Sequence, residues 1–398
     1  MNGAARSYAV VTGGYWAFTV TDGALRMLVV LHFHRLGYSP FEVAMLFLFY
    51  EFFGVVTNLV GGWLGARIGL NRTMHLGMAL QVVALGMLVV PAAWLTVPYV
   101  MAAQALSGIA KDLNKMSAKA SVKLMAPAGG DSPLLRWVAV LTGSKNALKG
   151  VGFFVGGALL AAIGFRGAVI ALAALVAVAL VATSWMLPGD LGRMSGKPKF
   201  RELFSKSAAI NQLSAARFFL FGARDVWFVV ALPVFLSAVL GWSFTGVGAF
   251  LASWVIGYGV VQALAPTLLR RGGRQPGGAA ARVWALALIL VPVAMAAALG
   301  TRADPATVMI SGLAAFGVVF AINSALHSYL ILAYSDRHGV SMNVGFYYMA
   351  NAGGRLAGTV LSGWVYQQFG MVGCLWVSAA FVLVTLLLSL RLPAVTTA

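Results

Sequence analysis

The sequence predicts an all-α membrane protein with twelve transmembrane helices, arranged as two pseudo-symmetric halves of six helices each. The chain of 398 residues is 61% hydrophobic and only 10% charged, whereas a soluble globular domain is about 25% charged. Its apolar residues fall into about twelve stretches that are long enough to cross a bilayer. Basic residues gather in alternate connections between these stretches, as the positive-inside rule requires.

Each predicted span is placed by the need for about 20 apolar residues. The spans of the first half are 13–33, 42–64, 73–90, 97–118, 134–163 and 168–187. The longest polar stretch of the chain, 188–206, follows them. The spans of the second half are 208–240, 245–268, 280–299, 306–334, 340–369 and 371–390. The predicted domains are therefore an N-terminal half at 1–187, a cytoplasmic loop at 188–206 and a C-terminal half at 207–398.

The Lys and Arg residues are distributed as the predicted membrane topology requires. If both termini are cytoplasmic, 17 of the 28 Lys and Arg residues lie in cytoplasmic loops and tails, 3 in outer loops and 8 within spans. This asymmetry explains most of the net charge of +18, and no soluble domain exists to hold a nucleic acid. The single cysteine, Cys374, excludes an internal disulfide and a cysteine metal cluster. The histidines lack metal-site spacing, so we expect neither a metal nor a cofactor.

The two halves repeat each other in sequence. Segments 21–39 (TDGALRMLVVLHFHRLGYS) and 223–243 (ARDVWFVVALPVFLSAVLGWS) both run from Arg and Asp to Leu-Gly-aromatic-Ser. NALKGVGFF and NAGGRLAGT both place an amide before a cation in a Gly-rich helix, which makes Arg355 the counterpart of Lys149. Two such halves are typical of secondary transporters, which bind the solute where the halves meet.

The stretch 106–124, LSGIAKDLNKMSAKASVKL, is unusually polar for a predicted span. Lys111 and Lys115 are four residues apart and share a helix face. Asp112 can pair with Lys115, which leaves Lys111 without an obvious local partner. Ionisable side chains at this depth cost about 2.5–3.5 kcal/mol on insertion scales, so they normally line a cavity or pathway. The stretch therefore predicts a cationic wall for an anionic solute, with a salt bridge that only fixes packing as the alternative.

Cations outnumber acids within the spans. The predicted substrate-binding residues are Arg26, Lys111, Lys115, Lys145, Lys149, Arg217, Arg224 and Arg355, together with Asn146 and Asn351. The acids within spans are Asp22, Glu51, Asp112 and Asp225, and they are the candidate proton carriers for coupled transport. Even if every acid is paired, about four positive charges remain, and burial then requires water or an anion beside them.

Two local pairings follow from spacing. Asp22 and Arg26 are four residues apart, which predicts an ion pair that is either functional or purely structural. Arg224 and Asp225 are adjacent and diverge by about 100° on a helix, so each is expected to find its partner elsewhere. Arg26 and Arg224 occupy matching places in the two halves. Two guanidinium groups so placed predict a bidentate clamp for phosphate-like groups.

The turn at 62–72, GWLGARIGLNR, resembles the loop signature of the major facilitator superfamily. Gly62, Arg67, Gly69 and Arg72 fit that signature, whereas Ala66 replaces its usual aspartate. Longer stretches resemble one family within it, the ArsJ organoarsenical efflux permeases. These stretches are YWAFTVTDGALRMLVVLHFHRLGYSP, FYEFFGVVTNLVGGWLGARIGLNRT, QALSGIAKDLNKMSAKASVKL, LTGSKNALKGVGFFVGG and SAARFFLFGARDVWFVVALPVFL.

The resemblance implies a bacterial inner-membrane exporter of 1-arseno-3-phosphoglycerate that confers arsenate resistance. It also implies a functional partner, the glyceraldehyde-3-phosphate dehydrogenase that makes this ester. We expect no enzyme, because the sequence has neither a Gly-rich phosphate loop nor a nucleophile elbow. Two alternatives remain open. One is an organophosphate or inorganic oxyanion exchanger of the same superfamily, and the other is an anion channel or a receptor that transports nothing.

Overall fold

The structure, a computed structural model, describes residues 3–36, 46, 48–126, 131–188, 191–193, 207–242, 244–269, 275–337 and 339–395. These residues form helices and connecting turns, with no strand among them. Most of the predicted loop 188–206 lies outside the described residues. Glu51 lies in a helix, but its side chain is not among the described parts of the structure.

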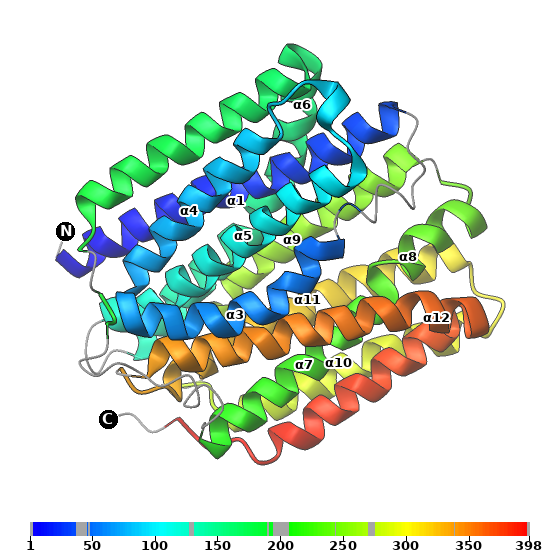
Figure 1. The fold of residues 1–398 in the computed structure, drawn as a ribbon. Helices are drawn as coiled ribbons and strands as arrows, with labels where there is room; N and C mark the ends of the chain where they lie inside the picture. The colour runs from blue at the N-terminus through cyan, green and yellow to red at the C-terminus, as the bar shows by residue number, and fades with distance from the viewer. Residues whose placement is uncertain are drawn as a thin grey trace. The chain divides into compact units, whose positions relative to one another are not determined.

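The helices follow the order of the predicted spans (Figure 1). The first are α1 (Gly3–Arg35), α3 (Leu48–Ile68), α4 (Leu70–Met87), the 3-10 turn η1 (Ala92–Trp94), α5 (Val97–Met125) and α6 (Asp131–Met186). The rest are α7 (Ala208–Phe228), α8 (Ala231–Val234), the π-helical turn η3 (Phe235–Val239), α9 (Phe244–Leu269), α10 (Gly278–Leu299), α11 (Pro305–Ala333) and α12 (Val340–Ser389). By length and composition, six of the described helical segments can cross a membrane.

Two of these helices are too long for one span. A bilayer core about 30 Å thick needs about 20 helical residues, whereas α6 has 56 residues and α12 has 50. Each contains one glycine in the left-handed region, Gly164 with φ 69° and Gly370 with φ 63°. Glycine adopts this conformation readily because it has no Cβ. Both glycines fall at predicted boundaries between spans, so α6 and α12 each supply two membrane spans.

With α6 and α12 divided, and α7, α8 and η3 taken as one continuous segment, the described helices correspond one to one with the predicted spans. The prediction of an all-helical fold is confirmed. Several boundaries differ: α1 begins at Gly3, well before the predicted start of that span at residue 13, and α5 continues to Met125, well beyond the predicted end of that span at residue 118. Lys119, predicted to lie in a cytoplasmic loop, is therefore a buried helical residue with 6% exposure.

The chain divides into two compact units. Unit 1 comprises residues 1–130, 144–205 and 335–349, and unit 2 comprises 131–143, 206–334 and 350–398. In unit 1, α5 packs against α1, α3 and α4. In unit 2, α11 packs against α7, α9 and α10.

Glycines allow the first turns of α12 to pack closely on α3 within unit 1. A Cβ added at Gly345 would lie 2.7 Å from the Asn58 carbonyl oxygen and 2.7 Å from Gly62 Cα. The Ser341 hydroxyl donates a 2.6 Å hydrogen bond to the Gly62 carbonyl at the same crossing. Small residues and backbone acceptors of this kind are the usual means of helix association in a bilayer.

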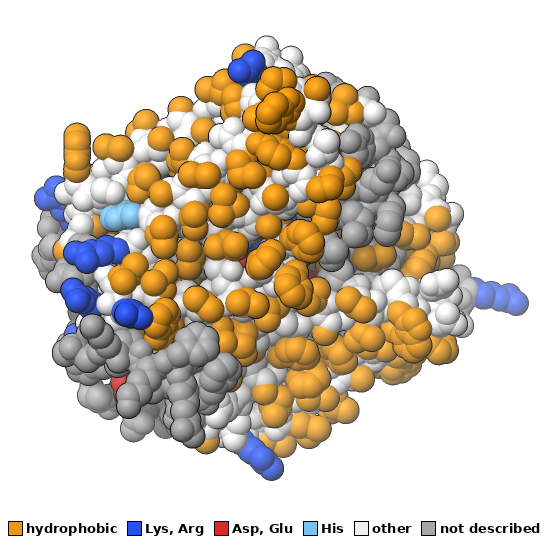
Figure 2. All heavy atoms as spheres, viewed as in Figure 1, with side chains coloured by type: hydrophobic (Ala, Val, Ile, Leu, Met, Phe, Trp, Pro, Cys, Tyr) orange, Lys and Arg blue, Asp and Glu red, His pale blue; other side chains and the backbone are white. Residues whose placement is uncertain are grey.

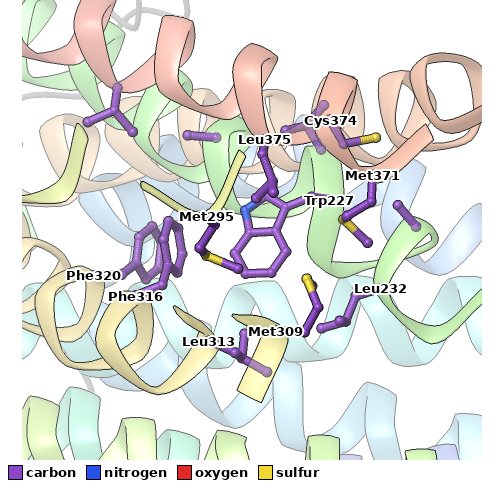
Figure 3. Packing of buried hydrophobic residues seen from close by; sticks show 14 of the residues in the cluster. Trp227, Leu232, Met295, Met309, Leu313, Phe316, Phe320, Met371, Cys374 and Leu375 are labelled. Carbon is purple, nitrogen blue, oxygen red and sulfur yellow. The ribbon is translucent and has the colours of Figure 1, made fainter. Parts of the chain in front are cut away.

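An aromatic core holds unit 2 together (Figure 3). Trp227 of α7 is fully buried and meets Phe316 of α11 edge to face, with ring centroids 5.1 Å apart. Phe316 stacks on Phe320 at 5.4 Å, and Met295 of α10 belongs to the same cluster. Such aromatic pairs contribute about 0.5–1.5 kcal/mol beyond the area they bury. The core therefore fixes α7, which carries three of the predicted site residues.

The surface is apolar, as expected for contact with lipid. On the face shown in Figure 2, hydrophobic side chains dominate, and the Lys and Arg side chains visible there lie near its borders. Trp185, Val178 and Val360 are 86%, 68% and 65% exposed. Large side chains exposed to this extent would be unfavourable in water but are compatible with a bilayer.

Candidate anion-binding clusters

The central half of α5 holds the first cluster of charges, in unit 1. Asp112 is 2% exposed, and Lys115 Nζ donates a hydrogen bond to Asp112 Oδ1. The predicted pair of Asp112 with Lys115 is therefore present. The expectation that Lys111 lacks a local partner is wrong, since Lys111 Nζ lies 3.9 Å from Asp112 Oδ2. The long lysine stem lets the ammonium group reach the carboxylate of the next residue, so one acid serves two cations.

Tyrosine rings contact the same lysines. Lys111 Nζ lies 3.6 Å from the centroid of the Tyr50 ring, and Lys115 Nζ lies 5.0 Å from that of Tyr348. The Arg26 guanidinium lies 5.3 Å from the Tyr50 ring. An aromatic face attracts a cation through its quadrupole but adds no negative charge. These contacts therefore stabilise the cations without themselves cancelling the positive charge.

Asp22 joins three helices of unit 1. Tyr50 of α3 donates a 2.5 Å hydrogen bond to Asp22 Oδ1 on α1. Lys149 Nζ of α6 lies 3.8 Å from Asp22 Oδ2. The predicted pairing of Asp22 with Arg26 stays a prediction. Lys145 and Asn146 lie half-buried on α6, one turn before Lys149.

Asp225 is the centre of the cluster in unit 2. Its carboxylate is fully buried, with Arg224 Nε 2.6 Å from Oδ1 and Arg355 Nε 3.2 Å from Oδ2. The expectation that Arg224 and Asp225 each pair elsewhere is wrong for Arg224. Adjacent Cβ atoms do diverge on a helix, but the flexible arginine side chain reaches back to the neighbouring carboxylate. Asp225 in addition binds Arg355 of α12.

Arg217 lies two turns before Arg224 and contacts an amide, a backbone carbonyl and an aromatic ring. Its Nε donates a 2.9 Å hydrogen bond to Asn351 Oδ1, and one terminal nitrogen donates at 3.2 Å to the Ser324 carbonyl. The guanidinium lies 3.9 Å from the centroid of the Phe221 ring. Arg217 is 3% exposed, and these contacts with neutral groups hold its buried guanidinium in place.

The same acid–cation arrangement occurs in each unit. In unit 1, an acid on the first helix of the sequence repeat, Asp22, lies beside Lys149. In unit 2, the corresponding acid, Asp225, lies beside Arg355. The equivalence of Lys149 and Arg355 inferred from the repeated sequence thus extends to their partners.

The described site residues carry an excess of positive charge. Unit 1 places five cations (Arg26, Lys111, Lys115, Lys145, Lys149) with the two acids Asp22 and Asp112. Unit 2 places three cations (Arg217, Arg224, Arg355) with Asp225. Counting Glu51, the third predicted acid of unit 1, the formal excess of positive side chains over acids is two in each unit. Charge of this kind at depth needs an opposite charge, water or a bound anion beside it.

The structure buries polar groups that are not among the predicted site residues. The sequence predicts Lys119 in a loop, although its spacing of four residues from Lys115 is a signal that α5 continues. Asn114, on α5, is fully buried, and neither its side-chain oxygen nor its nitrogen has a hydrogen-bond partner among the described residues. The same holds for both ring nitrogens of His327 on α11. Within the described part of the chain, no three His, Cys, Asp or Glu side chains group as metal ligands.

Comparison with known proteins agrees with this arrangement of helices. The profile of the Major Facilitator Superfamily matches residues 11–277. The structure of the human organic anion transporter MFSD10 (TETRAN) is similar with a TM-score of 0.79 and 17% identity, covering 98% of this chain and 100% of that chain. No curated protein matches the sequence.

Two further solved structures share the fold. For the proton:xylose symporter XylE bound to 6-bromo-6-deoxy-D-glucose, the TM-score is 0.74 at 15% identity, covering 96% of this chain and 94% of that chain. For a bacterial homologue of the iron transporter ferroportin in an outward-facing state, the TM-score is 0.75 at 14% identity, covering 97% and 98%. At such identities the similarity shows the fold alone.

Proposed function

This chain belongs to the Major Facilitator Superfamily, and we propose that it is a secondary-active exporter of an organoarsenical anion that confers arsenate resistance. The family and the fold establish a membrane transporter of a small solute. The proposed solute is 1-arseno-3-phosphoglycerate, as the resemblance to organoarsenical efflux permeases implies. The proposed location is the bacterial inner membrane, with both termini in the cytoplasm.

The observation that carries the proposal is the formal excess of positive side chains over acids among the predicted site residues of each unit. Asp112 and Asp225 each serve two cations, while Tyr50, Tyr348 and Phe221 contact cations without neutralising them. A neutral sugar does not require such charge, whereas a solute with two anionic groups can compensate it. MFSD10, which has the same fold, is described as an organic anion transporter.

Guanidinium groups suit an arsenate or phosphate group better than lysines alone. Arg224 and Arg355 present planar donors that can bind oxyanions through two parallel hydrogen bonds. Export against a gradient requires a coupled ion or a counter-anion. Among the described residues, Asp22, Asp112 and Asp225 are the buried carboxylates available to carry a proton, and Glu51 is the further candidate from the sequence.

Transport of the defined ester into everted membrane vesicles tests the proposal. We expect saturable uptake of 1-arseno-3-phosphoglycerate, competed by 3-phosphoglycerate more strongly than by inorganic phosphate. In a sensitive bacterium, the chain alone should give little arsenate tolerance, and co-expression with active glyceraldehyde-3-phosphate dehydrogenase should give strong tolerance.

The second candidate is an organophosphate or inorganic oxyanion exchanger, which the same charge excess also favours. Full protection in cells that lack every such dehydrogenase, or uptake of bare arsenate at an equal rate, would establish this candidate instead. Counterflow of labelled solute separates either carrier from an anion channel, because only a carrier accelerates exchange.

A further inference from the structure

We propose that Arg224 is the residue of the unit 2 cluster that binds a tetrahedral oxyanion group of the solute, through the terminal nitrogens of its guanidinium. This inference rests on the proposed function and deepens it in two ways. It selects one binding residue from the three arginines of the cluster, and it names the chemical group that this residue binds.

Arg224 is held at one edge of its guanidinium and has donors left at the other. Its Nε donates a 2.6 Å hydrogen bond to Asp225 Oδ1. A guanidinium carries five N–H donors, so four remain on the two terminal nitrogens. Within the described part of the chain, these terminal nitrogens donate no hydrogen bond. The side chain is 16% exposed, so its remaining donors are not sealed inside the core.

Phenyl rings surround the same guanidinium. Arg224 Cζ lies 4.9 Å from the centroid of the Phe221 ring and 5.4 Å from that of Phe320. The half-buried Phe228 ring lies at 6.0 Å. Aromatic faces attract the cation without cancelling its charge. Because apolar surroundings strengthen a charge-assisted hydrogen bond, an anion that reaches the terminal nitrogens is bound more strongly than it would be in water.

Arg217, one helical face along α7, uses its donors differently. Two of its nitrogens donate hydrogen bonds, to Asn351 Oδ1 of α12 and to the Ser324 carbonyl of α11. The residue is only 3% exposed. Arg217 therefore joins three helices of unit 2, whereas the donors of Arg224 do not serve packing.

The position of Arg355 favours a tetrahedral group over a carboxylate. Arg355 Nε lies 3.2 Å from Asp225 Oδ2, and Arg224 Nε lies on the other oxygen of the same carboxylate. The two guanidinium groups are therefore neighbours. A terminal phosphate or arsenate group has three oxygens in a tetrahedral arrangement and can accept from two neighbouring guanidinium groups at once. A carboxylate has two oxygens in one plane, which suit a single guanidinium.

The unfolding temperature of the purified full-length protein in detergent reports ligand binding, because a ligand that binds the folded state stabilises it. Glycerol 3-phosphate carries the tetrahedral group without a carboxylate, and glycerate carries the carboxylate without the tetrahedral group. We expect glycerol 3-phosphate to raise the unfolding temperature and glycerate to leave it unchanged. Equal stabilisation by glycerate would overturn the assignment of a tetrahedral group.

Two substitutions at Arg224 test the residue. Arg224→Lys retains the charge but replaces the planar fork by a point charge. It should need at least about ten times more glycerol 3-phosphate for the same stabilisation, which corresponds to about 1.4 kcal/mol. Arg224→Ala should lose the response altogether. Arg282→Lys is the matched control, because Arg282 of α10 lies outside the cluster and donates to the Leu390 carbonyl at 3.4 Å. It should respond at the same concentration as the parent.

The outcomes separate this inference from the proposed function. If either Arg224 variant responds as the parent does, or if Arg282→Lys is weakened as much as Arg224→Lys, Arg224 is not the binding residue, and the proposed function still stands. If glycerol 3-phosphate, 3-phosphoglycerate and inorganic phosphate all fail to stabilise the parent protein, the chain binds no such oxyanion, and the proposed function is wrong as well.

Discussion

Arg355 Nε on α12 lies 3.2 Å from Asp225 Oδ2 on α7, although 130 residues separate the two in the chain. Asp225 is fully buried and also binds Arg224, so a single acid anchors two guanidinium groups. Asp22 and Lys149 form the corresponding pair in unit 1. The repeated pairs orient the excess cations, and this relationship leads to the first prediction.

Asp225→Asn should destabilise the protein more than Arg355→Gln does. The asparagine removes a buried negative charge that pairs with two cations, Arg224 and Arg355, and loss of one member of a buried pair costs about 3–5 kcal/mol. Arg355 has a side chain that is 33% exposed, and its loss leaves Asp225 paired with Arg224. Thermal unfolding in detergent measures both effects. Equal unfolding temperatures for the two variants would contradict this reading of Asp225.

Lys111→Ala should abolish transport while the protein still reaches the membrane in near-normal amount. Lys111 is the more distant partner of Asp112, at 3.9 Å, and its removal leaves Lys115 hydrogen-bonded to the same acid. Lys115→Ala should also lower the folding yield, because it removes the closer partner of a buried carboxylate. Vesicle uptake and immunoblots of membranes separate the two effects. Normal transport by Lys111→Ala would refute a solute contact at this position.

Arg224→Ala should likewise abolish transport with little loss of protein, because Asp225 keeps Arg355 as its partner. The double variant Arg224→Ala/Arg355→Ala leaves the Asp225 carboxylate without either arginine and should fold poorly. The amount of each variant protein in the membrane, compared between the single and the double variant, tests this expectation. A double variant as abundant as the single one would show that the arginines are not needed to stabilise Asp225.

Gly156→Ala should impair folding, and Gly157→Ala should be tolerated. A Cβ at Gly156 would lie 2.4 Å from the Ala24 carbonyl oxygen and 2.9 Å from Ala24 Cα, so α1 and α6 would have to separate. A Cβ at Gly157 would meet nothing within 4 Å, and alanine is the better helix former. Expression level and unfolding temperature provide the comparison. Similar loss at both positions would argue against a close crossing of α1 and α6.

Asp304 should stabilise the start of α11 in a pH-dependent way. Thr307 donates from its hydroxyl at 2.6 Å and from its backbone N–H at 2.9 Å to the Asp304 carboxylate, and these bonds lower the pKa of Asp304. Because the pKa is lower in the folded state, the stabilisation is present above the ordinary pKa and is lost as the pH falls through the lowered one. Asp304→Ala should thus lower the unfolding temperature at pH 7 but not in strong acid.

Asp304→Asn is the matched control, since asparagine caps a helix without titrating. As the pH falls, the parent protein loses the stabilisation that the charged Asp304 carboxylate gives, whereas Asp304→Asn does not titrate. The unfolding temperature of Asp304→Asn relative to that of the parent should therefore rise as the pH falls. An effect of Asp304→Ala that persists unchanged in strong acid would show that the helix start does not depend on the charged carboxylate.

The sequence by itself determined the helices and their order along the chain. Apolar runs of about 20 residues can satisfy their backbone hydrogen bonds in lipid only as helices, so composition and length sufficed to predict the helices, although not the start of α1 or the end of α5. The boundaries at Gly164 and Gly370 were readable too, because a Phe-Gly or Gly-Phe step interrupts each long apolar run. The repeat further identified Lys149 and Arg355 as equivalent positions.

Only the tertiary structure decided which charges share an acid. Side-chain direction from Cβ geometry predicted that Arg224 and Asp225 diverge. Long flexible side chains, however, move their charged ends by several ångströms, and a buried charge is stabilised by the nearest opposite charge. The contact of Tyr348 with both Lys115 and Lys119 joins residues more than 220 positions apart in the chain, which no local periodicity reports. Helix periodicity operates over a few residues, whereas the pairing of charges depends on which helices pack together.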